Sequence, residues 1–449
     1  MSMAITQSAK RIRKRVIFGG LAFFILVLGC FAIPTTICET FANRALEVRD
    51  PECTLRWTLF QKTWLGSTHR SVVLETLAHL QLGENTNARL SAKRLGSLSS
   101  DKTIPDALDQ LVSIQLGDSK LLNELLSRQA DWLPLSAVFE ASARCHLFHV
   151  DQDSLAATFH HWAEFNPRDS AIEYYKGRWD EISNRFEAAV VHYQKCESQN
   201  ASFAKSTFRK GIMLRELRRL DEALVAFKQI QKSDLESIAA VEIANCHLLL
   251  GNPDAGLNEV RNHLELPVAT QSRQYLRADQ FVEGDRFALV GASILESLGR
   301  YDEALVLLRR VLTANHRDSQ ARTLMISCLN RLGKPDEATE ESKILAEMAS
   351  GKLESKNLAE QLDVDGTDYA KRLRYAELLF RYKSLGESQF EAEKLLKDFQ
   401  NKAETHRLLS QIYREHARDT ADWDVRADEQ ERLALKLEAQ NQLAKPSGP

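Results

Sequence analysis

Hydrophobic residues recur along most of the chain at the three- and four-residue spacing of amphipathic helices. In "LGRYDEALVLLRRVL" (298–312) a Leu-Gly pair is followed by a short polar stretch and then by a helix with one apolar face. Nearly the same phrase begins again 34 residues later, at 332, as "LGKPDEATEESKILA" (332–346). Alternating strand patterns are not evident. We therefore predict an all-α protein built from repeated pairs of helices.

A small or apolar residue marks the same place in successive units. An aromatic residue follows four positions later in several of them, as Phe159, Tyr193 and Phe227 do. A small side chain lets the second helix of a pair approach the first, and the aromatic ring fills the groove between neighbours. The marked positions recur about every 34 residues, with one longer step of 48 that predicts an insertion near 265–281: Ala88, Leu122, Leu155, Ala189, Ala223, Gly256, Ala304 and Ala338.

The period and the placement of the small residues together resemble the tetratricopeptide repeat (TPR) superfamily, over about residues 69–350. The resemblance implies two antiparallel helices per unit and a right-handed solenoid of about 8–9 helix pairs, since one pair cannot bury its own apolar face. The chain departs from the family pattern because the Trp at the fourth position of each unit is missing and the closing Pro is mostly absent.

The N-terminal region has the charge pattern of a single membrane anchor. Residues 1–15 carry five Lys or Arg and no acid, and residues 16–38 carry no charge. A helix of 23 residues spans about 35 Å, enough to cross a bilayer. The basic side predicts a cytoplasmic N-terminus and a periplasmic or otherwise extracytoplasmic remainder. A cleaved signal segment, and a lipoprotein modified at Cys30, remain as alternatives.

The repeat and the predicted anchor together suggest a linear organisation of the chain. A degenerate ninth pair is expected at 374–399 and a charged final helix at 420–444. The segments are a cytoplasmic basic segment (1–15), a transmembrane anchor or signal segment (16–38), a linker and N-terminal cap (39–68), the TPR array (69–350), a degenerate repeat with C-terminal capping helices (351–444) and a tail (445–449).

The cysteines and histidines indicate packing rather than chemistry. Cys145, Cys246 and Cys328 each lie ten residues before the marked position of their unit, where other units carry apolar residues, and Cys196 takes a second small-residue position. Cys38 and Cys53 lie outside the repeat, so a disulfide between them stays open in an oxidising compartment. The four histidines lack the CxxC pair of a zinc site, and we expect no metal there: His146, His149, His160 and His161.

One motif deserves comparison with an enzyme family. "DVDGTD" (363–368) matches the Asp-x-Asp-Gly-Thr motif of haloacid-dehalogenase-type phosphatases, in which the motif follows a strand. An amphipathic helix precedes it here and another follows, and Arg374 stands where a calcium loop would need an acid. We interpret the motif as a loop between helices. Phosphate-binding glycine loops, nucleophile elbows and zinc-protease helices were not found.

The TPR resemblance also implies where a partner would bind, because the first helix of each pair lines the concave groove. Lys205 and Arg209 match half of the carboxylate clamp of chaperone-binding TPRs, whereas Glu140 and Arg144 stand where its Lys and Asn would be. Cations and aromatics in the groove suit a peptide that carries acidic residues. The implied groove residues are Arg144, Tyr174, Arg178, Lys205, Phe208, Arg209, Arg215 and Asn245.

These patterns predict a non-enzymatic, membrane-anchored scaffold that binds a protein or an extended, possibly acidic peptide in its groove, without a cofactor. The net charge is −3, and without the five basic residues of 1–15 it is near −8, which argues against general nucleic-acid binding. Envelope assembly, secretion or a membrane complex would use such a scaffold. Two alternatives are an enzyme with a site in 350–449 and a purely structural oligomerisation module.

Overall fold

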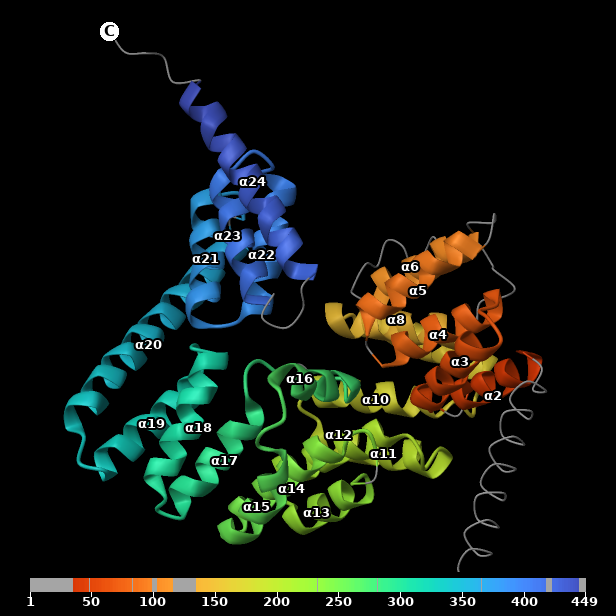
Figure 1. The fold of residues 1–449 in the computed structure, drawn as a ribbon, viewed down its shortest axis with the longest axis horizontal. Coiled ribbons are helices and arrows are strands. Elements are labelled where there is room, and N and C mark those ends of the chain that lie inside the picture. Colours follow the sequence, from red (N-terminus) through yellow and green to blue (C-terminus); the bar gives the residue numbers. More distant parts are fainter. Residues whose placement is uncertain are drawn as a thin grey trace, which may run out of the picture. The chain divides into compact units, whose positions relative to one another are not determined.

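The computed structural model describes residues 35–47, 49–82, 84–98, 103–115, 135–231, 233–280, 282–364, 366–416 and 422–443. Within these ranges all regular elements are helices and none is a strand, which confirms the all-α prediction (Figure 1). The chain divides into two compact units. The first unit contains the described residues up to Ala239 together with Leu276–Gln280, and the second contains those of Ala240–Tyr275 and Phe281–Pro449.

Consecutive helices of the first unit pack against each other in sequence order, as expected for stacked helix pairs. The unit boundary falls within α14 (Glu236–Leu249) and again within α16 (Val268–Arg277). The complete helices of the first unit are α2 (Thr35–Glu47), α3 (Pro51–Trp64), α4 (His69–Gln81), α5 (Asn85–Leu98), α6 (Thr103–Gln115), α8 (Leu135–His149), α9 (Gln152–Phe165), α10 (Ser170–Ile182), α11 (Phe186–Gln199), α12 (Ala204–Glu216) and α13 (Leu220–Gln229).

The second unit continues the same arrangement. Its longest helix, α20, has 30 residues and runs through position 350. Its complete elements are α15 (Pro253–Val260), the short 3-10 helix η1 (Arg261–His263), α17 (Arg286–Ser297), α18 (Tyr301–Ala314), α19 (Ser319–Arg331), α20 (Pro335–Val364), α21 (Tyr369–Tyr382), α22 (Leu385–Asp398), α23 (Ala403–His416) and α24 (Asp422–Leu443).

The turn inside each helix pair explains the 34-residue period. One residue with positive φ ends the first helix, and the amide of the next residue donates to the carbonyl five positions back, as from Arg300 to Leu295 (2.8 Å) and from Lys334 to Leu329 (2.9 Å). This is a Schellman turn, in which glycine avoids the steric cost of a Cβ. The positive-φ residues at these turns are Arg49, Val150, Asn184, Arg218, Gly251, Gly299 and Gly333.

The turn at Arg49 adds a helix pair that the sequence analysis did not recognise. Residues 39–68 were expected to form a linker and cap, but α2 and α3 are joined by the same turn as the later pairs, with Arg49 at φ 64° and the amide of Asp50 donating to the carbonyl of Ala45. Sequence reasoning missed this pair because its residues depart from the family pattern at the marked position.

The marked small residues are buried, as their packing role predicts: Ala189, Ala223 and Ala304 have no exposed surface. The aromatic residue four positions later lies against the glycine of the preceding helix. A Cβ on Gly211 would come within 2.6 Å of the Phe227 ring. Close helix contact therefore depends on this glycine.

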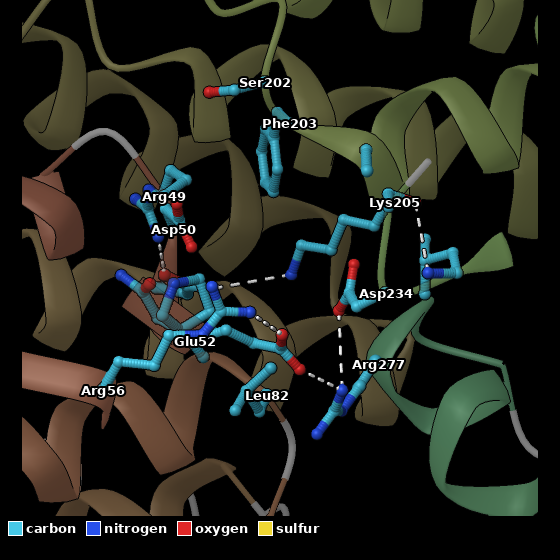
Figure 2. Close-up of a pocket in the computed structure, with 16 residues that line it drawn as sticks. Arg49, Asp50, Glu52, Arg56, Leu82, Ser202, Phe203, Lys205, Asp234 and Arg277 are labelled. Atoms are coloured by element: carbon cyan, nitrogen blue, oxygen red, sulfur yellow. Dashed lines mark hydrogen bonds and ion pairs between the residues drawn. The ribbon is translucent and has the colours of Figure 1, made fainter. Parts of the chain in front are cut away.

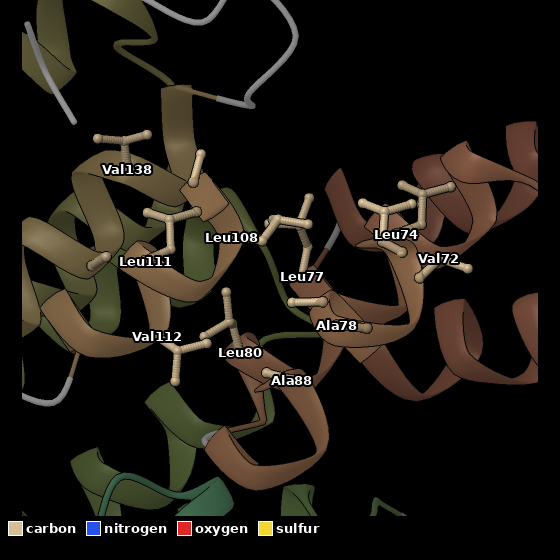
Figure 3. Packing of buried hydrophobic residues seen from close by; sticks show 14 of the residues in the cluster. Val72, Leu74, Leu77, Ala78, Leu80, Ala88, Leu108, Leu111, Val112 and Val138 are labelled. Carbon is tan, nitrogen blue, oxygen red and sulfur yellow. The ribbon is translucent and has the colours of Figure 1, made fainter. Parts of the chain in front are cut away.

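The core of the first unit runs between successive pairs rather than through one centre. Figure 3 shows Val72 and Leu77 from α4, Ala88 from α5, Leu108 from α6 and Val138 from α8 in one cluster. Cys145 belongs to the same cluster, and Cys196, Cys246 and Cys328 are also fully buried, as the repeat phase predicted. These cysteines pack as small hydrophobic side chains.

The insertion forms a separate element. We expected the extra residues near 265–281 to lengthen helices or add a turn; instead η1 is followed by the additional helix α16 and by a non-helical segment that leads to α17. Asp285 caps α17 by accepting from the amide of Ala288 (2.9 Å) and pairs with Arg310 (2.7 Å). These contacts fix where the inserted segment returns to the repeat.

Several predictions concern the N-terminal region. Residues 1–34, which contain the basic segment, Cys30 and most of the predicted anchor, lie outside the described residues, as does Leu122. Residues 35–38 begin α2, where Cys38 is buried. Cys38 and Cys53 are free thiols, so no disulfide joins them. Among the helices of the described ranges, none is both long and apolar enough to cross a membrane.

The DVDGTD motif connects two helices. α20 ends at Val364 and α21 begins at Tyr369, with Asp368 as its cap accepting from the amide of Lys371 (3.2 Å). The described residues of 350–449 contain no strand on which a phosphatase motif could sit. The side chains of Asp363 and Asp365 lie outside what the structure describes.

Candidate functional site

The first helices of three successive pairs place charged and aromatic side chains on one face. Each helix presents two residues four positions apart, which lie on the same side of a helix. α8 contributes Glu140 and Arg144, α10 contributes Tyr174 and Arg178, and α12 contributes Lys205 and Arg209. This is the face that the TPR resemblance assigns to the partner-binding groove.

In the structure this face of the first unit is covered by the chain's own segment 276–280, at the end of α16. Asp279 has φ 52°, a left-handed conformation that turns the chain at this point. Its carboxylate accepts a hydrogen bond from Tyr174 Oη (2.6 Å) and forms ion pairs with Lys205 Nζ (3.3 Å) and Arg144 Nη2 (3.6 Å). A side chain from a distant part of the sequence thus occupies the predicted carboxylate site.

The surrounding charges keep Asp279 ionised. Burial by itself would raise its pKa, but the positive charges of Lys205, Arg144 and Arg178 outweigh burial and hold the pKa of Asp279 well below its usual range. Tyr174 is fully buried, and burial raises its pKa well above the ordinary value, so its hydroxyl remains a donor to the carboxylate. The site is therefore built for an anion.

Glu140 is a second anion in the same network. Tyr175 Oη donates to it (2.9 Å), Arg144 pairs with it (3.3 Å), and Arg49 from the α2–α3 turn contacts its other oxygen. Burial opposes ionisation, but Arg49, Arg144 and Lys205 lower the pKa of Glu140 to about 2. Arg49 also pairs with Asp169 (3.2 Å), the N-cap of α10. Glu140 thus links three helix pairs.

A neighbouring group anchors the end of the segment. Arg209 donates through Nε to Glu181 (3.1 Å) and through Nη1 to the side-chain oxygen of Gln280 (3.4 Å). Arg178 also pairs with Glu181 (3.1 Å), which accepts from Tyr193 as well (2.8 Å). The cations of α10 and α12 are thus shared between Glu181 and the segment.

Beside the segment lies a cavity of about 250 Å³ within the first unit (Figure 2). Arg277, the last residue of α16, lies at the wall of this cavity and forms ion pairs with Glu52, Glu84 (3.3 Å) and Asp234 (3.7 Å). Burial and the charge of Glu52 raise the pKa of Asp234. The remaining lining comes mainly from the start of α3 and from the loops before α12 and α14: Asp50, Pro51, Arg56, Ser202, Phe203, Ala204, Ser233 and Leu235.

The cavity mouth carries a cation that is open to solvent. The Arg56 side chain is 80% exposed and pairs only loosely with Glu52 (3.6 Å). By contrast, the side chain of Lys205 at the inner wall is 9% exposed and its ammonium lies over the rings of Tyr174 (4.8 Å) and Phe203 (5.2 Å). The cavity lining thus includes one solvent-exposed cation, Arg56, and one buried cation, Lys205, whose ammonium lies over aromatic rings.

The structure separates the eight predicted groove residues into two sets. Five of them gather around segment 276–280: Arg144, Tyr174, Arg178, Lys205 and Arg209. The other three do not. Phe208 is fully buried with its ring against Phe227 (5.7 Å), Arg215 pairs with the adjacent Glu216 (2.8 Å), and Asn245 lies in the second unit, where it donates to Glu242 (3.3 Å).

Segment 276–280 thus lies against five of the eight predicted groove residues in the structure. Lys205 and Arg209 face the segment, whereas Phe208, three residues after Lys205, turns toward α13 and becomes part of the core. Sequence reasoning also missed Asp279, Arg49 and Glu181. The available signal was an acidic residue inside the predicted insertion, but nothing local indicates that it folds back onto α8, α10 and α12.

Taken by its own geometry, the described part of the chain defines an all-helical repeat protein with TPR-like pairs. No protein-family model matches the chain, and neither does the sequence of any curated protein. Among solved structures, TPR proteins resemble it. YrrB, described as a TPR protein with an unusual peptide-binding site, shares 15% identity over 47% of this chain and 95% of that chain, with a TM-score of 0.31.

Two larger structures are similar over more of the chain. Yeast Tom70 shares 12% identity over 92% of this chain and 90% of that chain, with a TM-score of 0.35. A chain of the APC/C hetero-tetramer Cut9-Hcn1 shares 12% identity over 82% and 68% respectively, with a TM-score of 0.43. Similarity at this level transfers no site and no activity to the present chain.

Proposed function

We propose that the protein is a membrane-anchored, non-enzymatic scaffold of the TPR type, and that the cavity of its first unit binds an extended acidic segment of a partner protein. Assembly or secretion at a cell envelope, or the assembly of a membrane complex, is the process that such a scaffold would serve. The predicted anchor at 16–38 supports the membrane part of the proposal.

The observation that carries the proposal is the seating of segment 276–280. A short stretch with one carboxylate, formed by the end of α16 and the turn that follows it, lies on the first helices of three pairs and is held by Tyr174, Lys205 and Arg144. This is how a peptide with an acidic side chain would be held, because each contact is a charge-assisted hydrogen bond or ion pair. The cavity beside it offers a continuation of the same surface, with Arg56 exposed at its mouth.

A catalytic role receives less support from the cavity. Its acidic and basic side chains are largely paired with one another, as Glu140 is with Arg49 and Glu52 is with Arg277. An acid or base for catalysis would need a carboxylate or cation directed at a substrate instead. Asp234, whose pKa is raised, still has Arg277 within 3.7 Å.

The proposal is tested by placing a photo-crosslinking amino acid at Ser202, on the cavity wall, in the full chain within its own membranes. A discrete crosslinked partner is expected from Ser202. A crosslinker at Val225, which is 59% exposed on α13 and does not line the cavity, should not give that product. The same adduct from both positions, or none from Ser202, would refute binding in the cavity.

Charge reversal should be made at Arg56 rather than at the buried arginines. Arg144 and Arg178 hold internal anions, so reversing them would disturb folding as well as binding. Arg56→Glu removes an exposed charge from the cavity mouth and should weaken the Ser202 crosslink. Arg70→Glu is the matched control, because Arg70 is exposed on α4 and lies outside the cavity lining.

A further inference from the structure

The first helix pair exposes an unusual amount of aromatic surface. Phe41 on α2 is 48% exposed and Trp64 at the end of α3 is 55% exposed, and Ile37 is 42% exposed one turn before Phe41. Large apolar side chains gathered on one exposed face of a folded protein mark a site of contact with another protein or with a membrane.

These side chains form one patch. Phe41 stacks on Trp57 with ring centroids 5.0 Å apart, and Trp57 contacts Phe60 edge-on at 6.3 Å. Trp57, Phe60 and Trp64 follow each other at three and four residues along α3, so they share a helix face. Trp57 also packs against the buried core of the first unit, which fixes the patch to the folded body.

The position of the patch in the chain identifies its occupant. The charge-free sequence that starts at Val16 reaches Thr35, the first residue of α2, and continues to Cys38. At 1.5 Å per helical residue, Ile37 and Phe41 lie at most about 3 and 9 Å beyond Thr35. This distance is comparable with the headgroup layer, which is roughly 5–8 Å thick on each side of the hydrocarbon core.

The composition of the patch points to the same occupant. Tryptophan is enriched where protein meets the headgroup layer, because its ring is apolar while its indole N–H remains a hydrogen-bond donor. The patch carries two of the six tryptophans of the chain, Trp57 and Trp64. Val191 on α11, Val225 on α13 and Val306 on α18 are at least as exposed as Phe41, but they are not aromatic and lie far from the predicted anchor in sequence.

We infer that Ile37, Phe41, Trp57, Phe60 and Trp64 form a membrane-interface surface that sits in the headgroup layer of a phospholipid bilayer. The surface fixes the orientation of the first helix pair relative to the membrane. The inference shares the predicted anchor with the proposed function, but it does not depend on binding in the cavity.

The test uses the full chain reconstituted into phosphatidylcholine vesicles that contain a nitroxide-labelled lipid. A nitroxide on the headgroup should quench tryptophan emission more than a nitroxide near the end of the acyl chain. The double variant Trp57→Phe and Trp64→Phe should lose most of this lipid-dependent quenching. Trp179→Phe, a control on α10 in the repeat array, should leave it unchanged.

The possible outcomes separate the inference from the proposed function. Vesicle-bound protein whose quenching is the same in the double variant would overturn the interface surface while leaving the anchor intact. Quenching that is absent because the patch contacts a second protein copy, seen as a crosslink between copies at Trp64, would overturn it as well. Protein that does not float with vesicles would refute both the anchor and the surface, whereas the Ser202 crosslink would still report on the cavity.

A second variant guards against unfolding. Phe41→Gln removes the ring that stacks on Trp57 without touching a buried position, and it should reduce headgroup quenching of the remaining tryptophans. Phe390→Gln is its matched control, because Phe390 on α22 is 53% exposed and lies in the other unit. Equal quenching in the two variants would contradict the inference.

Discussion

Removing the charge of Asp279 should loosen segment 276–280 from the first unit. Asp279→Asn keeps the size of the side chain but abolishes its ion pairs with Lys205 and Arg144. The two cations remain largely out of water, since their side chains are 9% and 13% exposed. Glu140, at 4.0 Å from Lys205, then provides the nearest negative charge.

The expected cost follows from this geometry. Removing one partner of a buried ion pair costs about 3–5 kcal/mol. Asp279 is 17% exposed and Glu140 compensates in part, so we expect the lower end of that range, about 3 kcal/mol. If the whole loss lowers the free energy needed for local opening of the segment, the amides of the segment should exchange with solvent about 150-fold faster. The amide of Asp279, which donates to the carbonyl of Leu276 (2.9 Å), is among them.

Hydrogen exchange followed by mass spectrometry would measure this change in the peptide that contains 276–280. Asp221→Asn is the matched control, because Asp221 is exposed on α13. In this variant the free energy of opening of segment 276–280, derived from its exchange rates, should stay within a few tenths of a kcal/mol of the native value. Exchange of the segment within about threefold of the native rate in Asp279→Asn would refute the reasoning. The double variant with Lys205→Met should lose less than the sum of the single changes, since the stranded cation is removed as well.

Three further predictions test other parts of the structure. The pKa values of Asp279 and Glu140 are lower in the folded chain than their ordinary values near 4. The stability that these two carboxylates contribute is therefore complete above about pH 4 and is lost as the pH falls toward 2. In thermal melts, the difference in melting temperature between the native protein and Asp279→Asn should shrink over this window. Gly211→Ala places a Cβ within 2.6 Å of the Phe227 ring. The overpacking, about 1–3 kcal/mol, should exceed the gain of about 1 kcal/mol in helix propensity and so lower the melting temperature. Gly96→Ala should not lower it, because the atom nearest to the added Cβ is 3.7 Å away. If α24 joins two copies, as the oligomerisation alternative requires, Leu435→Glu at its 54% exposed side chain should lower the mass measured by light scattering, and an unchanged mass would argue against α24 as the contact.

The repeat architecture was largely readable from sequence because its determinants are local. The turn phrase recurs where a residue takes positive φ, and Gly299 and Gly333 stand at these positions in the two phrases that repeat most clearly. Ala189, Ala223 and Ala304 are buried, as are Cys145, Cys246 and Cys328, because these recurring positions lie on the packing faces of their helices. The pair α2–α3 was missed because its residues depart from the family pattern at the marked position, although Arg49 takes the same turn conformation as in the later pairs.

The state of the groove was decided by tertiary structure alone. Asp279 contacts Lys205 across 74 residues of sequence and Tyr174 across 105, through an inserted segment whose return path no local pattern encodes. Whether Lys205 faces a partner or an internal carboxylate depends on that path, although its place on α12 follows from the repeat. Sequence by itself determined the helix pairs, their period and which side chains share a face, because those depend on neighbours within one unit. Only the folded chain decided what covers that face, because the covering residue comes from elsewhere in the sequence.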